Sequence, residues 1–243
     1  MLKFFRQIRQ TLIMENKTTK YFKYAIGEIL LVVIGILIAL QINNWNEGRK
    51  EHKMSIQFLD GIKEDLKKDI KLADSVLKFN KESFSIISSI DSVFHKKSFY
   101  KAEEHRDFFG KPDTLNFEQV FYRPQSFRPI NGTYNSLVSD GKTTLIKNKA
   151  LLGKIQLIYS ENHQRVSSNY EVIKVLEVQL GLSYSMEKDL WSYLDLKKAK
   201  DKKIFYDLVN FTNEKYFYSQ NLLRIKKNSQ DVINLINAEL NND

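Results

Sequence analysis

The residue types that usually carry catalysis or bind metals are sparse in this sequence, and they lack the spacings that such chemistry needs. The chain has no cysteine, which excludes disulfides, thiol catalysis and cysteine zinc sites. None of its four histidines stands in an H-E-x-x-H pair or another paired-ligand spacing. We therefore predict that the protein is not an enzyme and that it has no catalytic residue, no metal site and no cofactor.

One short motif, residues 139–143 with the sequence SDGKT, looks like the end of a phosphate-binding loop. That loop needs a glycine five residues before its second glycine, and Ser136 stands there instead. A phosphate-binding loop also follows a β-strand, whereas in this chain the residues before Gly141 have the apolar spacing of a short helix. We predict a helix over residues 134–140 that Gly141 ends in the left-handed conformation.

Acidic and basic residues alternate along residues 63–69. Glu64, Asp65 and Asp69 lie among three lysines at the spacing of ion pairs on one helix, which predicts a solvated helix face. The whole chain carries 38 basic and 29 acidic residues, a net charge of +9. Beyond the N-terminal region the two signs are interleaved rather than clustered, so we expect no nucleic-acid partner.

Residues 25–40 are all apolar or glycine except Glu28. With the flanking Tyr24 and Trp45, which suit the membrane interface, they form a helix of roughly 33 Å, enough to cross a hydrocarbon core of ~30 Å. A cleaved signal peptide would need small residues after the apolar stretch, and a buried core helix would need a polar face. We predict an uncleaved signal anchor, with residues 1–23 before the membrane, 24–45 across it and 46–243 beyond it.

The flanking charges predict the orientation of this span. Six basic residues and one acidic residue precede it, whereas three basic and two acidic residues follow directly after it. The positive-inside rule then places the N-terminus in the cytoplasm and residues 46–243 outside. Residues 1–14 have apolar and basic positions that favour a helix lying in the membrane interface, with membrane lipid as its partner.

Four residues within the span are candidates for helix packing. Gly27, Gly35 and Ala39 share one stripe of the helix, and Gly35-xxx-Ala39 is a pair of small residues that allows two helices to approach closely. This predicts a homo-oligomer or an envelope protein partner. Glu28 either contacts such a partner or pairs with a lysine at the interface.

The first 47 residues resemble a family of small uncharacterised membrane proteins common in Bacteroidetes; they include the anchor YAIGEILLVVIGILIALQINNWNE. A weaker match is Tyr134-xx-Leu137-xxx-Gly141, followed by Leu145-Ile146-x-Asn148. The resemblance implies an inner-membrane protein with a periplasmic helical domain of unknown function. It supplies no catalytic residues.

The rest of the chain predicts an all-α fold. Apolar steps of three and four continue from residue 58 to residue 94, which indicates one long helix, continuous with the span or forming a coiled coil, with Gly61 as its weakest point. The periodicity breaks over residues 96–129, where all three prolines fall. Further helices are expected from residue 145 or 148 to 180, over 186–200 and over 204–240, which together predict a helical bundle.

These observations favour a protein-interaction or scaffold module in the cell envelope. The alternative is a sensor or small-ligand-binding module with a pocket lined by aromatic residues such as Phe127, Tyr134 and Tyr159. A third class, less favoured, is a periplasmic enzyme whose site matches no recognised motif.

Overall fold

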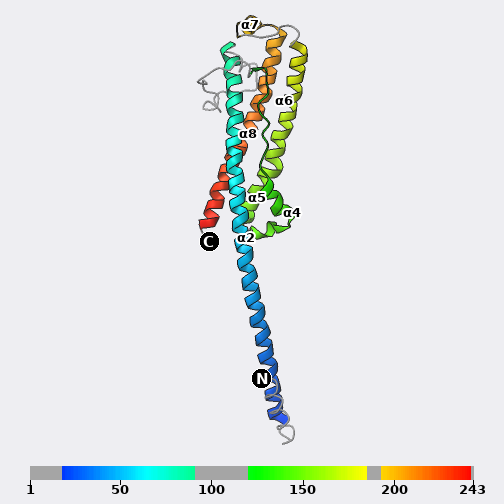
Figure 1. Cartoon of the computed structure of the whole chain (residues 1–243), viewed down its shortest axis with the longest axis vertical. Coiled ribbons are helices and arrows are strands. Elements are labelled where there is room, and N and C mark those ends of the chain that lie inside the picture. Colours follow the sequence, from blue (N-terminus) through cyan, green and yellow to red (C-terminus); the bar gives the residue numbers. More distant parts are fainter. Residues whose placement is uncertain (1–17, 91–119, 185–192, 242–243) are drawn as a thin grey trace. The chain divides into compact units, whose positions relative to one another are not determined.

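A computed structural model describes residues 18–90, 120–184 and 193–241 (Figure 1). Every regular element in these ranges is helical and none is a strand, so the predicted all-α fold is confirmed. The predictions for residues 1–14, 96–119 and 186–192 lie outside the described residues. The α-helices are α2 (Thr18–Ile90), α4 (Gly132–Ser139), α5 (Lys149–Leu157), α6 (His163–Tyr184), α7 (Tyr193–Lys198) and α8 (Lys203–Asn241).

The chain divides into two compact units, Met1–Ser55 and Ile56–Asp243, and the division falls inside α2. In the first unit, α2 contains a stretch that is long and apolar enough to cross a membrane. The large apolar side chains between Ile26 and Ile42 are 45–66% exposed, and none is buried in the protein. At the end of this stretch the Arg49 guanidinium lies 5.6 Å from the centre of the Trp45 ring.

In the second unit the C-terminal part of α2 packs with α5, α6 and α8 (Figure 1). Their apolar side chains form two separate clusters. Cluster 1 takes residues 73–90 of α2, 166–184 of α6 and 204–225 of α8, whereas cluster 2 takes residues 59–66 of α2, 151–158 of α5 and the π-helix, and 232–236 of α8. The helical periodicity from residue 58 onward therefore marks positions that are buried in this unit.

The second long helix begins where the sequence predicts. Asn148 is its N-cap, and Asn148 Oδ1 accepts a hydrogen bond of 3.1 Å from the backbone N–H of Leu151. Helix α5 continues through one π-helical turn, Ile158–Asn162, directly into α6. Only Tyr193–Lys198 of the helix predicted over residues 186–200 is described, as α7.

Gly141 ends the short helix α4 as predicted. Its φ of 66° and ψ of 22° lie in the left-handed region, and its N–H donates to the carbonyl of Val138 over 3.1 Å. This geometry is a helix C-terminus rather than a phosphate-binding loop.

Gly61, which the sequence suggests as the weakest point of the helix, does not interrupt α2. It lies instead where α4 contacts α2. A Cβ at this position would lie 2.7 Å from Cγ2 and 3.1 Å from Oγ1 of Thr133 in α4. The missing side chain is what allows α4 to approach α2 so closely.

Candidate functional site

Residues 121–131 have no regular secondary structure, and they run along the second unit between α6 and the helices α2 and α8 (Figure 1). Part of this segment is buried, as at Phe127, and backbone N–H groups that packing removes from water need acceptors within the protein. Side chains of all three helices supply them, for this segment and for the first turn of α4. The bonds run from Arg123 N to Glu177 Oε1 (2.8 Å), from Phe127 N to Tyr218 Oη (2.8 Å), from Ile130 N to Asp69 Oδ1 (2.9 Å) and from Thr133 N to Asp65 Oδ2 (3.4 Å).

The solvated face predicted for residues 63–69 is right for Glu64 and wrong for Asp65 and Asp69. Glu64 is exposed and pairs with Lys67 at 2.7 Å. Asp69 is completely buried and Asp65 is 8% exposed. Both aspartates face the 121–131 segment and α4 because the backbone N–H groups there need acceptors, and Asp65 places its carboxylate at the N-terminus of α4, where negative charge is favoured.

Polar side chains separate the two apolar clusters at the same level of three helices. We call Asp69 of α2, Asn162 and His163 of the α5–α6 run, and Ser229 of α8 the polar layer. All four are at most 6% exposed, and each lies between the cluster 1 and cluster 2 residues of its own helix. The π-helical turn Ile158–Asn162 falls at this level, and such turns often occur at functional sites.

Asp69 and His163 form the centre of the polar layer. Asp69 Oδ2 lies 3.8 Å from His163 Nε2, beyond hydrogen-bond distance, and neither atom has a hydrogen-bond partner within the described ranges. Burial raises the pKa of Asp69 to about 7, with the charge of Asp65 adding to the rise. Burial also lowers the pKa of His163 to about 4. Between pH 4 and 7, therefore, Asp69 carries a proton and His163 is neutral.

Aromatic rings cover this pair. Tyr134 and Tyr159 stack with their ring centres 4.4 Å apart. The His163 ring packs edge-to-face with Tyr159 and with Phe127, with ring centres 5.1 Å and 5.9 Å apart. Burial, followed by the charges of Asp69 and Asp65, raises the pKa of Tyr159. Of the three aromatics predicted to line a pocket, Tyr134 and Tyr159 therefore pack against each other, and Phe127 reaches them through the His163 ring. Over the described residues no group of three or more His, Asp or Glu side chains could hold a metal ion.

A buried lysine binds the residue that precedes the 121–131 segment. Lys215 of α8 is fully buried, and its Nζ donates to the carbonyl of Val120 (3.3 Å) and to Ser83 Oγ (3.2 Å). The Phe211 ring lies 4.3 Å from the same nitrogen. Burial lowers the pKa of Lys215 well below its usual value. Asn80 of α2 fixes this turn of α8 by donating to the Lys215 carbonyl at 3.3 Å.

The packing candidates of the apolar stretch all lie on α2. A Cβ at Gly27 or Gly35 would meet no atom within 4 Å, so this stripe is open to the surroundings. Ala39 is exposed and Glu28 is half-buried. Tyr24 belongs to the same helix, but its side chain is outside the described part. These residues belong to the first unit, whereas the polar layer belongs to the second.

The weaker sequence motif consists of residues with structural tasks. All of them except Leu145 either pack in cluster 2 or lie at a helix end, which explains these positions without any chemistry. Tyr134 stacks on Tyr159, Leu137 and Ile146 are buried in cluster 2, Gly141 ends α4 and Asn148 caps α5.

Helix α6 carries an exposed apolar face that the sequence analysis missed. We call Val172, Val175, Val178 and Leu182 the α6 stripe; their exposed fractions are 46%, 55%, 54% and 77%. Spacings of three, three and four residues place them on one side of the helix. The opposite side, with Ile173, is buried in cluster 1. A helix with two apolar faces is the signal that could have revealed this stripe.

A family of unknown function, DUF6090, matches residues 28–213 of the chain. The chain belongs to the DUF6090 family. The matched region of this family member begins at Glu28 in the apolar stretch and ends at Asn213 in α8, so it includes Asp69, His163 and the α6 stripe. No curated protein and no solved structure matches the chain.

Proposed function

We propose that this DUF6090 protein is anchored in the inner membrane by residues 24–45 and that its helical unit is an interaction module that pairs with a second copy of the same chain. In this proposal the N-terminus is cytoplasmic and residues 46–243 are periplasmic. The exposed apolar α6 stripe is the observation that carries the interaction role.

The exposed stretch of α2 supports the anchor. Twelve large apolar side chains between Ile26 and Ile42 are each at least 45% exposed, which would be unfavourable in water and is favourable in lipid. The flanking basic residues support the cytoplasmic side for the N-terminus.

The residue types of the α6 stripe support an interface. Valine is a weaker helix former than alanine or the charged residues that usually occupy exposed positions. The three exposed valines therefore do not add to the stability of the helix. Contiguous exposed apolar side chains on one face are typical of binding surfaces. Near the N-terminus of α6, the side of the helix that carries the stripe is polar, with Gln164 and Ser168. The apolar stripe is therefore limited to the C-terminal half of α6.

A second copy is the occupant that fits a patch of this size. Four aliphatic side chains expose on the order of a few hundred Å², whereas a stable interface between free proteins buries about 800 Å² on each partner. Confinement in one membrane raises the effective concentration of two copies and lets a smaller contact suffice. Another copy is always confined in the same way and presents the same stripe, as a two-fold contact requires.

The experiment that tests the anchor and its orientation uses the full chain. The protein should stay with membranes in high salt and be released only by detergent, and a reporter that is active only in the periplasm should be active when fused after Asp243. Activity of a cytoplasm-only reporter at that position would overturn the orientation.

The interaction role is tested by Val175→Glu in the full chain. We expect the variant to fold, because Val175 is exposed and glutamate favours a helix, and to lose most of the self-association that crosslinking detects in native membranes. Gln164→Glu, which adds the same charge to the same helix outside the stripe, is the control. Equal dimer yields for the two variants would contradict the proposal.

A further inference from the structure

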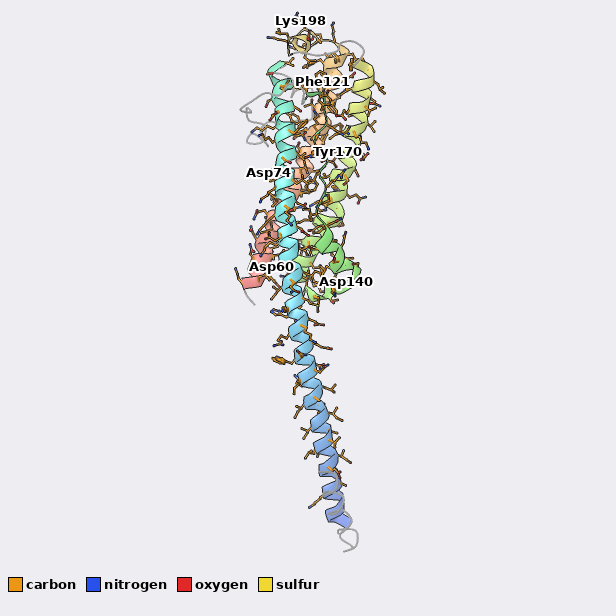
Figure 2. The ribbon with its side chains drawn as sticks, viewed as in Figure 1. Asp60, Asp74, Phe121, Asp140, Tyr170 and Lys198 are labelled. Carbon is orange, nitrogen blue, oxygen red and sulfur yellow. The ribbon has the colours of Figure 1, made fainter. Side chains whose placement is uncertain are left out.

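An open pocket of about 750 Å³ lies beside residues 122–128 of the 121–131 segment. Tyr122, Arg123 and Arg128 line it from the segment, Leu72 from α2, and Tyr170 and Glu177 from α6. Its volume falls in the range of small-molecule sites. Tyr170, labelled in Figure 2, extends from α6 toward this segment, and its hydroxyl accepts a hydrogen bond of 3.2 Å from Arg123 Nε.

The charges of the pocket do not balance. Arg123 binds both carboxylate oxygens of Glu177, one through its backbone N–H (2.8 Å) and the other through Nη1. The hydrogen bond to Tyr170, followed by the charge of Glu177, raises the pKa of Arg123. Arg128 is exposed and makes no hydrogen bond or ion pair with any part of the chain that the structure describes. One guanidinium thus remains for an anion.

The surroundings of Arg128 also suit the body of a ligand. The Tyr122 ring is 58% exposed, and Leu72 and Pro124 add apolar wall. The backbone N–H groups of Gln125 and Ser126 donate no hydrogen bond within the described ranges, so they remain as further donors. A guanidinium and an exposed aromatic side chain in one pocket suit a carboxylate or phosphate oxyanion attached to an apolar group.

We propose that this pocket binds a small organic oxyanion, with Arg128 holding the carboxylate or phosphate group and Tyr122 contacting an adjoining apolar body. This binding site is separate from the α6 stripe and goes beyond the proposed pairing of two copies. The oxyanion can come from a soluble metabolite or from the headgroup of an anionic lipid. Arg123 is a positioning residue, since its guanidinium is held by Glu177 and Tyr170.

The test is calorimetric titration of the full chain in phosphatidylcholine nanodiscs with phenyl phosphate as the probe. Wild-type protein should bind phenyl phosphate, and should bind phenol or inorganic phosphate more weakly because each is only half of the ligand. Arg128→Gln should weaken binding of phenyl phosphate about tenfold. Since Arg128 is exposed and has no partner among the described residues, the variant should keep the wild-type melting temperature.

Arg224→Gln on α8 removes the same charge from an exposed position outside the pocket and should leave the affinity unchanged. Nanodiscs that contain phosphatidylglycerol distinguish the two sources, because a headgroup in the pocket would compete with phenyl phosphate in the wild-type protein, whereas a site for soluble anions would be unaffected. The proposal is overturned if the wild-type protein does not bind phenyl phosphate, or if Arg128→Gln and Arg224→Gln lower its affinity equally.

Discussion

Asp69 Oδ2 and His163 Nε2 face each other across 3.8 Å in the buried layer between two apolar clusters. Asp69 also accepts a hydrogen bond from the backbone N–H of Ile130, so the pair links α2, α6 and the 121–131 segment. Burying two titratable groups in a helical unit costs folding free energy. Its protonation has consequences for stability that can be measured.

The first prediction concerns the pH dependence of this pair. Below its folded pKa of about 7, Asp69 holds a proton that the unfolded chain releases above 3.8, so its contribution to stability falls as pH rises from 4 to 7. His163, with a folded pKa of about 4 against 6.5, contributes stability that rises with pH over 4 to 6.5. The two contributions cancel over most of this window.

Removing one partner should expose the slope of the other. In Asp69→Asn the free energy of unfolding should rise between pH 4 and 6.5 by up to about 3 kcal/mol, and in His163→Gln it should fall over the same window. Denaturant titrations of the full chain in detergent across this range check both slopes. Parallel pH profiles for the wild type and the two variants would contradict these two opposite pKa shifts.

A second prediction concerns Gly61. Alanine normally stabilises a helix by about 1 kcal/mol relative to glycine, but a Cβ here would lie 2.7 Å from Thr133 Cγ2. Gly61→Ala should therefore lower the free energy of unfolding by about 1 kcal/mol. Gly153→Ala in α5, where a Cβ meets nothing within 4 Å, should raise it. Thr133→Ser, which removes Cγ2, should rescue Gly61→Ala, and failure of this rescue would argue against the contact.

The end of α4 gives a third prediction. Gly141 has a φ of 66°, where a Cβ is unfavourable, so Gly141→Ala should destabilise the protein by roughly 1 kcal/mol. Gly141→Asn should cost less, because asparagine tolerates this conformation. Thermal unfolding of the full chain measures both changes, and an unchanged melting temperature for Gly141→Ala would count against the left-handed cap.

A fourth prediction tests the small-residue stripe in the apolar stretch. If Gly27, Gly35 and Ala39 pack against another copy in the membrane, Gly35→Ile should reduce crosslinked dimer because it prevents close approach. Glu28→Gln should preserve or increase the dimer, since two close copies would bring two acids together. Val33→Ile, which adds bulk to another side of the helix, is the control. If Gly35→Ile leaves the dimer yield unchanged, this part of α2 serves as an anchor alone.

The helices were predictable because their apolar spacing reports burial directly, as for Ile62 and Leu66, both completely buried in cluster 2. The burial of Asp65 and Asp69 was not predictable, because their acceptor role depends on backbone N–H groups more than 60 residues away in the sequence. The local sequence pattern of an aspartate among lysines is the same whether the side chain faces water or another segment of the chain.

The two proposed binding surfaces were harder to predict for a similar reason. Val175 and Ile173 are both β-branched apolar residues on α6, yet one is 55% exposed and the other is completely buried. Residue type alone does not separate an interface from a core. Arg128 likewise belongs to the loop-rich region, and only the fold brings it to the same pocket as Tyr170.

Crosslinking through single cysteines tests the proposed pairing most directly, because the chain has no cysteine of its own. Val175→Cys and Leu182→Cys lie in the α6 stripe, whereas Lys174→Cys and Gln164→Cys are exposed positions on the same helix outside it. In native membranes treated with a short bismaleimide, the two stripe variants should give covalent dimers and the two controls should give little. Equal yields at all four positions, or none at Val175→Cys, would contradict the pairing of two copies through α6.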